Sequence, residues 1–185
     1  LTFLESHEDG ENSVDGLDNA TSVTVSPDGK NVYATGNSTG NGGEDESLAV
    51  FTRNTETGAL TFLESHEDGE NSVDGLDGPF GVALDHDGEN VYVSSFSDSA
   101  LAVFSRNSST GALTFTQVIK QTDSGVDGLG GAYAVTVSPD NKNVYVGAQS
   151  GNDLTVFDRN TDTGVLTFRE VHSNGDNETY SLYHV

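Results

Sequence analysis

Residues 60–77 read LTFLESHEDGENSVDGLD, and residues 1–18 read the same at all 18 positions. The triplet LTF that opens this stretch recurs at Leu113 and Leu166, so its four copies are spaced by 59, 53 and 53 residues. Self-similarity at a long fixed period is typical of repeat proteins, in which each unit buries its apolar surface against its neighbours. The repeat therefore constrains the fold more strongly than any single residue does.

Each repeat contains four short segments that have the pattern of β-strands. In the middle of the chain these are Phe80–Asp85, VYVSS at 91–95, LAVF at 101–104 and LTFTQ at 113–117. Asp-Gly or Pro-Asp pairs separate the first two segments, as in tight hairpin turns. No segment has a sustained apolar period of 3.6 residues, so we expect no helix.

The chain is strongly acidic and contains few apolar residues. It has 30 Asp and Glu residues against 7 Lys and Arg residues, a net charge of −23, and a hydrophobic share of 33%. A charge of this sign repels nucleic acids and anionic membranes, so we expect neither as a partner. No apolar run reaches the ~18 residues of a membrane helix, so we expect no membrane insertion. The absence of Cys excludes disulfides and thiolate chemistry.

Two longer stretches carry a family resemblance. Residues 26–37 read SPDGKNVYATGN and residues 138–149 read SPDNKNVYVGAQ, and each is followed by a strand, an RNxxTGxL turn and LTF. This pattern resembles the repeat of YVTN and lactonase-type β-propellers, which include 6-phosphogluconolactonase-like proteins, usually with seven blades. The resemblance covers essentially the whole chain and rests on turn and strand residues, so it assigns a fold without assigning a catalytic residue.

The predicted fold class is all-β: a β-propeller made of four-stranded antiparallel blades, with about three complete blades. A β-sandwich is the alternative, but it does not require a repeating unit. We expect a single propeller array over residues 1–185, with units at 1–59, 60–112 and 113–165. Residues 166–185 would supply the last outer strand and the start of a further blade.

The order of the strands leaves both ends of the array open. The chain starts on the fourth strand of a unit and stops inside the first strand of another, so orphan strands with unpaired edges are expected at both ends. Either the chain is a fragment of a longer propeller, or copies complete one another as a closed dimer or an open filament. The residues predicted to pair in the second case are Leu1, Thr2, Phe3, Leu4, Glu5, Tyr180, Leu182, Tyr183 and Val185.

Two kinds of loop are candidates for Ca²⁺ binding, the one cofactor we consider. Asp158, Asn160 and Asp162 follow the pattern D-x-N-x-D-x-G, the first half of an EF-hand loop, but position 169, where the bidentate Glu belongs, is Arg. The acidic loops at Glu8–Asp18 and Glu67–Asp77 are rich in oxygen ligands. In both cases an ordinary hairpin turn or solvated loop explains the same residues.

We predict an extracellular or cell-surface protein with a structural or adhesive role. Its partners would be other copies of itself, and a filament is one form that this self-association could take. The alternatives are a fragment of a lactonase-like hydrolase acting on sugar lactones, or a ligand-binding propeller scaffold. No G-x-S-x-G motif or phosphate-binding glycine loop is present, so no catalytic residue is assigned. Sequons that would accept glycans in a secreted protein begin at Asn19, Asn37, Asn107 and Asn177.

Overall fold

The structure is a computed structural model that describes residues 2–37 and 46–174 of the chain. Twelve strands form three four-stranded antiparallel sheets in the orders β1-β2-β3-β4, β5-β6-β7-β8 and β9-β10-β11-β12, which we call blades 1, 2 and 3. The strands are β1 Ala20–Val25, β2 Asn31–Gly36, β3 Ser47–Arg53, β4 Leu60–Glu67, β5 Pro79–Leu84, β6 Asn90–Ser95, β7 Ala100–Arg106, β8 Leu113–Lys120, β9 Ala132–Val137, β10 Asn143–Ala148, β11 Asp153–Arg159 and β12 Leu166–Ser173.

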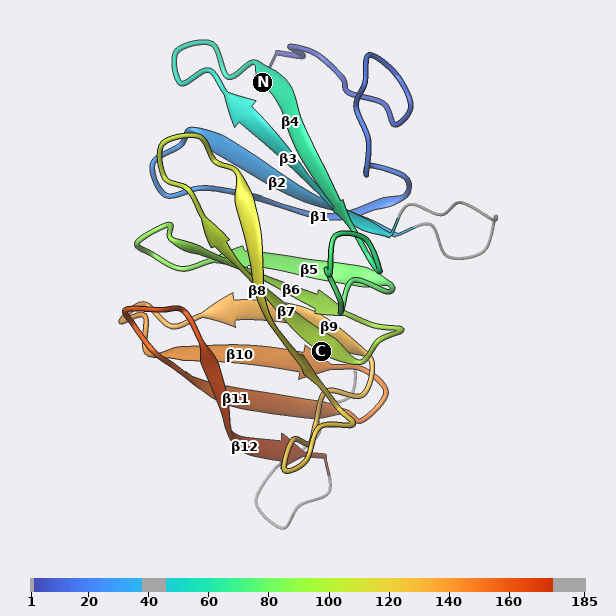
Figure 1. Cartoon of the computed structure of the whole chain (residues 1–185), viewed down its shortest axis with the longest axis vertical. Coiled ribbons are helices and arrows are strands. Elements are labelled where there is room, and N and C mark those ends of the chain that lie inside the picture. Colours follow the sequence, from blue (N-terminus) through green and yellow to red (C-terminus); the bar gives the residue numbers. More distant parts are fainter. Residues whose placement is uncertain (1, 38–45, 175–185) are drawn as a thin grey trace.

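The prediction of an all-β propeller array is confirmed. The blades stack face to face along the long axis of the molecule, in chain order (Figure 1). The described residues contain no helix, and therefore none long and apolar enough to cross a membrane. The second strand of blades 1 and 2 is buried along its whole length, because a neighbouring blade or loop covers each face. The small and β-branched residues of NVYATG and NVYVSS suit this position between two packed surfaces.

Two apolar cores lie between the blades. In the first, Tyr33, Leu48 and Val50 of blade 1 pack against a surface of blade 2 that includes Val82 and Val91. We call the side of a blade that carries the Tyr, Leu and Val the trailing face, and the side of the next blade that it meets the leading face. The same faces of blades 2 and 3 form the second core, so one interface is repeated twice.

A buried arginine joins blade 1 to blade 2. Arg106, the last residue of β7, donates from Nε to the Tyr33 hydroxyl over 2.7 Å. Its Nη2 donates to Asn31 over 2.7 Å and forms an ion pair with Asp28 at 3.0 Å. Burial raises the pKa of Asp28, but hydrogen bonds from Ser26 and the Arg106 cation outweigh burial and lower it to about 2. This network fixes the two blades relative to each other, and we call it the arginine clamp.

The arginine clamp recurs between blades 2 and 3. Arg159, at the end of β11, donates from Nε to the Tyr92 hydroxyl over 2.6 Å and from Nη2 to Asn90 over 3.0 Å. Its Nη2 also pairs with Asp85, and both side chains are buried. Asp85 is the first residue of its hairpin turn, whereas Asp28 is the third residue of its own. The carboxylate therefore comes from a different position of the turn at each interface, whereas the Arg, Tyr and Asn occupy equivalent positions.

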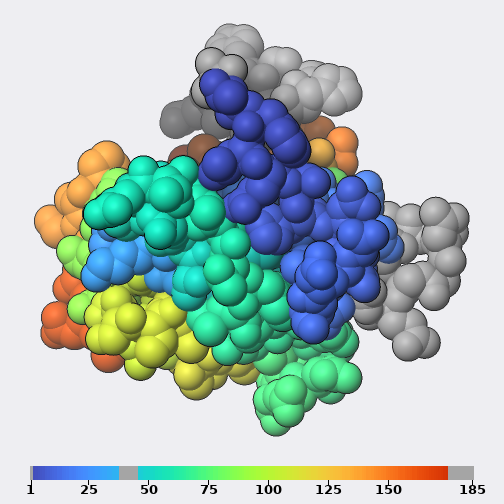
Figure 2. Space-filling model, turned by 90° about the horizontal axis from the view of Figure 1, so that it is seen from above, coloured from blue at the N-terminus to red at the C-terminus, as the bar shows by residue number. Residues whose placement is uncertain are grey.

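The N-terminal segment departs from the prediction of an orphan strand. Residues 2–8 form no strand, although the identical sequence forms β4. The segment nevertheless occupies an outer-strand position: Glu5 accepts a hydrogen bond from the Leu60 backbone N–H over 2.6 Å, as Glu64 accepts one from Leu113 over 2.7 Å. It lies on the outward side of blade 1 (Figure 2). It lacks a neighbouring third strand within the described residues, so strand pairing cannot form.

We predict that Arg159→Ala lowers the free energy of unfolding by about 3–5 kcal/mol, because it leaves the buried Asp85 carboxylate without its cation. Arg169→Ala is the matched control, since Arg169 pairs with Asp158 at the exposed surface and should cost less than about 1 kcal/mol. Urea unfolding of both variants measures the difference. Equal losses in the two variants would contradict a stabilising role for the clamp.

Candidate functional site

The loops at one end of the array bring together residues from different blades. This end, which we call the loop face, carries the end of β2, the start of β3, the loops that follow β6 and β10, and the loops that join one blade to the next. The loop at 96–99 ties these connections together. The Phe96 N–H donates to the Gly78 carbonyl over 2.7 Å, and the Gly131 N–H donates to the Ser99 hydroxyl over 3.1 Å. The loop face is therefore cross-linked across the blade boundaries.

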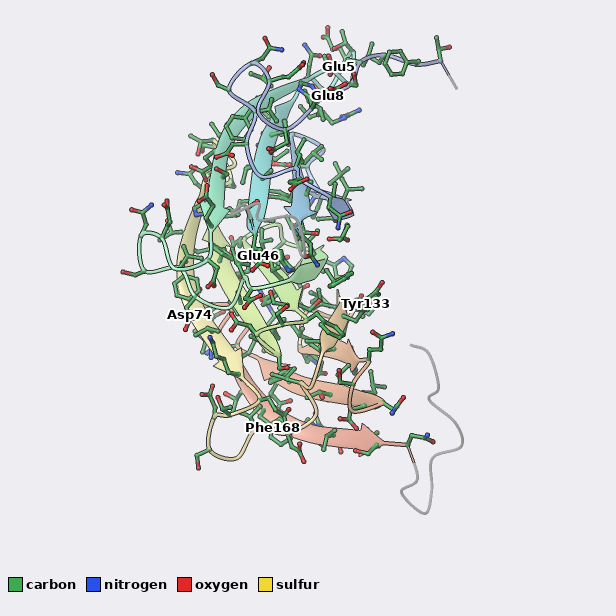
Figure 3. All side chains as sticks on the ribbon, turned by 90° about the vertical axis from the view of Figure 1, so that its right-hand side faces the viewer. Glu5, Glu8, Glu46, Asp74, Tyr133 and Phe168 are labelled. Atoms are coloured by element: carbon green, nitrogen blue, oxygen red, sulfur yellow. The ribbon has the colours of Figure 1, made fainter. Side chains whose placement is uncertain are left out.

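An aromatic cluster lies at the start of β5 and β9. These are the first strands of blades 2 and 3, and we call the first strand of each blade its inner strand and the fourth its outer strand. Phe80 of β5 stacks on Tyr133 of β9 with 4.5 Å between ring centroids and 24° between ring planes, and it meets Phe96 edge-on at 5.9 Å. The Tyr133 side chain remains exposed, and it projects from the inner-strand edge of the array (Figure 3). Blade 1 has Thr21 at the equivalent position of β1. The aromatic surface is therefore specific to blades 2 and 3.

A pair of carboxyl groups occupies the middle of the loop face. Glu46, just before β3, shares a hydrogen bond with Asp77, just before β5. Burial, followed by this hydrogen bond and the charge of Asp77, raises the pKa of Glu46 from 4.5 to about 7. A carboxyl group that titrates near neutrality is suited to transferring protons in either direction. In Figure 3 Glu46 lies between the outer Asp74 and the inner Tyr133.

Two further carboxylates contact a lysine toward the outer strands, and a third carboxylate lies beside them. Lys120, at the end of β8, approaches Asp74 to 2.6 Å and Asp98 to 3.0 Å. Burial lowers the pKa of Lys120, but these two carboxylates outweigh burial and raise it to about 12. Asp68, Asp74 and Asp98 lie close enough to share one metal ion. The Lys120 ammonium already supplies positive charge to this group, so its geometry is explained without a metal.

The acidic loops have a clear structural function. The first side chain after each outer-strand segment accepts a hydrogen bond from the backbone N–H of a leucine eight residues later. These pairs are Asp9 with Leu17 at 2.8 Å, Asp68 with Leu76 at 2.9 Å, and Gln121 with Leu129 at 2.6 Å. Because the neutral Gln121 performs the same task, the brace requires a hydrogen-bond acceptor rather than a negative charge.

The structure places the EF-hand-like candidates in a hairpin turn. Asn160 accepts the Asp162 backbone N–H over 2.9 Å, and Asn54 makes the same bond in the equivalent turn of blade 1. Asp158 faces the Arg169 guanidinium at 3.1 Å. Within the described part of the chain, three acidic side chains lie close enough to share an ion only near Lys120, and this turn does not contain such a group. Ca²⁺ binding by these residues stays a prediction.

The remaining predicted residues lie at the two ends and on the surface. Thr2, Phe3, Leu4 and Glu5 are exposed on the outward side of blade 1. Leu1, Tyr180, Leu182, Tyr183, Val185 and the sequon residue Asn177 lie outside the described residues. Asn19 and Asn107 are exposed, whereas Asn37 is fully buried, which disfavours a glycan at that position. Pairing and glycosylation at these sites stay predictions.

The sequence model of a protein family matches almost the whole described chain. The family is described as Lactonase, 7-bladed beta-propeller, and its overlapping matches cover residues 2–126 and 73–178. The chain belongs to this lactonase family. The predicted resemblance is thereby confirmed, and membership supports the propeller geometry of the blades. No curated protein sequence matches the chain.

Solved structures share the fold of this lactonase-family chain. The periplasmic gluconolactonase of Pseudomonas aeruginosa is 22% identical with a TM-score of 0.68, over 84% of this chain and 40% of that one. A protein from Lactobacillus plantarum is 25% identical with a TM-score of 0.66, over 82% and 41% of the two chains. A provisional 6-phosphogluconolactonase from Bacteroides fragilis is 18% identical with a TM-score of 0.65, over 83% and 39%. The lactonase-family chain thus spans about two fifths of these proteins.

Sequence reasoning missed the groups that meet on the loop face. Glu46 ends the extra loop that lengthens the first repeat from 53 to 59 residues, and Phe80 and Tyr133 stand where blade 1 has Thr21. A comparison of the repeats could have identified them, because residues that maintain the fold recur in every unit and these residues do not. Asp77 does not carry this signal, because it belongs to the stretch that repeats residues 1–18.

We predict that stability falls as the pH rises from about 5 to 7, in part because folded Glu46 keeps a proton that the unfolded chain has released. Glu46→Gln cannot titrate, so its thermal midpoint should fall less than that of the parent protein between pH 5 and 8. Glu56→Gln, on an exposed turn, is the control and should follow the parent. An unchanged pH dependence in Glu46→Gln would refute the assignment.

Proposed function

We propose that this chain is part of a lactonase-like hydrolase that opens a sugar lactone at the loop face. The observation that carries the proposal is the Glu46–Asp77 carboxyl pair on the loop face of a lactonase-family propeller. Solved relatives of the same fold include a periplasmic gluconolactonase. The family match and this carboxyl pair favour the hydrolase over the structural role that was our leading sequence-based prediction.

The carboxyl pair has the chemistry that lactone hydrolysis requires. A water molecule attacks the ester carbonyl carbon while the unprotonated carboxylate accepts one of its protons. The bond between the carbonyl carbon and the ring oxygen then breaks, and the protonated carboxyl donates its proton to that oxygen. The product is a hydroxy acid. A pair that holds one proton near neutral pH can perform both transfers, and Glu46 has a pKa of about 7 beside Asp77.

The aromatic cluster supports a sugar-derived substrate. Tyr133 presents an exposed ring, held in place by stacking on Phe80, at the inner-strand edge of the array (Figure 3). An amphipathic ring of this kind contacts the apolar side of a polyol while its hydroxyl remains available for hydrogen bonding. In the proposal, Tyr133 positions the lactone ring and the carboxyl pair acts on its ester group.

The proposal includes a location outside the cytoplasm. The Pseudomonas aeruginosa relative is a periplasmic protein, which supports export without fixing the compartment. The net charge of −23 is compatible with a soluble exported protein, because carboxylates keep the surface hydrated. A cell-surface or periplasmic site refines the extracellular location predicted from the sequence.

We predict that the 185-residue chain hydrolyses glucono-δ-lactone faster than the spontaneous reaction, as measured by proton release at constant pH. Glu46→Gln should lower kcat by about 100-fold, because it removes one of the two proton-transfer groups. Tyr133→Ala should mainly raise KM, because it removes a binding surface and leaves the carboxyl pair intact.

Glu56→Gln is the matched control and should retain the parent rate, because Glu56 lies on an exposed hairpin turn away from these groups. Far-UV circular dichroism of each variant confirms that the fold is retained. A parent rate equal to the spontaneous rate would overturn the hydrolase proposal for this chain, as would an undiminished rate in Glu46→Gln.

A further inference from the structure

The loop at 96–99, between β6 and β7, fixes the backbone of Asp77. The Asp98 N–H donates to the Asp77 carbonyl over 3.1 Å, and the Asp77 N–H donates to the Asp98 carboxylate over 3.4 Å. One residue along, the Phe96 N–H donates to the Gly78 carbonyl over 2.7 Å. Asp77 therefore takes its position from this loop rather than from strand pairing.

Gly78 allows the loop to come this close. Its φ is +66°, and a Cβ at this position would lie 2.5 Å from the Ser97 hydroxyl oxygen, so a side chain would push the loop away. The Gly78 N–H also donates to the carboxyl group of Glu46. The 96–99 loop thus determines where both members of the carboxyl pair lie.

Lys120 holds the side chain of Asp98. Its ammonium donates over 3.0 Å to the Asp98 carboxylate oxygen that does not face Asp77, and it approaches Asp74 to 2.6 Å. The Asp98 side chain is 17% exposed and that of Asp74 is 51% exposed, so solvent screens the ion pair with Asp98 less. Asp68, Asp74 and Asp98 also repel one another, because their oxygens lie within 4.8 Å, and the cation offsets this repulsion.

The interface between blades 2 and 3 has no charge at the equivalent positions. At the first interface, the residues joined by these contacts are Glu46, Asp77, Asp98 and Lys120. The residues at the same places relative to the strands of the second interface are Ser99, Gly130, Gly151 and Ser173. The second interface still has its apolar core and its arginine clamp. Stacking of blades therefore does not require Lys120 and Asp98, which occur together with the carboxyl pair.

We propose that Lys120 is a positioning residue for the carboxyl pair and acts on it through Asp98. The ammonium holds the Asp98 carboxylate, and Asp98 holds the backbone of Asp77. The Asp77 side chain is thereby kept within hydrogen-bonding reach of Glu46. The consequence for catalysis rests on the proposed function, whereas the effect on the carboxyl pair can be measured without a substrate.

A direct effect of charge makes a different prediction. Asp77 and Asp68 face Glu46 and both raise its pKa, with Asp98, Asp74 and Lys120 behind them. By charge alone, loss of the lysine cation would raise the pKa of Glu46 further, and loss of the Asp98 carboxylate would lower it. Loss of position lowers the pKa in both cases, because Glu46 is then separated from Asp77.

Carbon-13 NMR of the glutamate side-chain carboxyl groups measures this pKa, and the signal missing from Glu46→Gln identifies Glu46. We expect Lys120→Met and Asp98→Ala each to lower the Glu46 midpoint from near 7 by about one pH unit. Lys120→Arg keeps a cation for Asp98 and should restore most of the difference. Lys142→Met is the matched control, because Lys142 faces the exposed Asp140 at 3.6 Å in a hairpin turn, and it should follow the parent.

The kinetics of glucono-δ-lactone hydrolysis provide a second readout. Lys120→Met and Asp98→Ala should each lower kcat by about 10-fold and leave KM nearly unchanged, because a displaced carboxyl pair transfers protons less well. The double variant should lose no more than either single variant, since both changes break the same series of contacts. Lys142→Met should retain the parent kcat.

The outcomes separate this inference from the proposed function. Midpoints that move in opposite directions in Lys120→Met and Asp98→Ala would indicate a direct effect of charge and overturn the positioning role, as would an unchanged midpoint in either variant. If the parent chain fails to hydrolyse the lactone, the proposed function fails and the NMR titration alone decides the role of Lys120. If the parent is active and both folded variants keep its kcat, the inference fails and the proposed function stands. Far-UV circular dichroism checks folding, and Asp98→Ala supplies the test should Lys120→Met not fold.

Discussion

The burial of one arginine side chain at each blade interface is the constraint on which the array depends. A guanidinium keeps its charge in the protein interior, so it must be surrounded by acceptors in fixed positions. A tyrosine hydroxyl, an asparagine carbonyl and a carboxylate of the preceding blade meet that requirement at both interfaces. The apolar faces supply most of the buried area, but they are non-directional. The arginine clamp therefore fixes how far one blade is shifted against the next.

A fixed relation between blades determines the chemistry of the loop face. Glu46 and Asp77 belong to loops of blade 1 and of the connection to blade 2, and they share a hydrogen bond only because the blades are held in register. The stacking of Phe80 on Tyr133 likewise joins blades 2 and 3. Each of these contacts places polar or aromatic groups from separate repeats within a few ångströms. The structural repeat thus supports a loop face that is not itself repeated.

Residues 1–18 and 60–77 have the same sequence, so any structural difference between them comes from their tertiary surroundings. Both copies brace their acidic loop through the same aspartate-to-leucine hydrogen bond, at 2.8 and 2.9 Å, and both set a histidine against a phenylalanine of the next blade, at 5.4 and 5.3 Å. Yet residues 60–67 form a strand and residues 2–8 do not. The bonds of a strand come from a neighbour, so strand structure requires a partner whatever the local sequence. Contacts that depend on the following blade are preserved in both copies.

The sequence by itself determined the all-β class, the four strands of each blade and the hairpin turns, because alternation and turn chemistry act over a few residues. The repeat also shows that an Arg and a Tyr recur in each unit, but not that they meet, since Arg106 and Tyr33 are separated by 73 positions. Only the tertiary structure decided which carboxyl group has a raised pKa, which aromatic ring is exposed, and which arginine binds which tyrosine. These properties depend on burial and on the distances between residues of different blades, and stacking of the blades sets both.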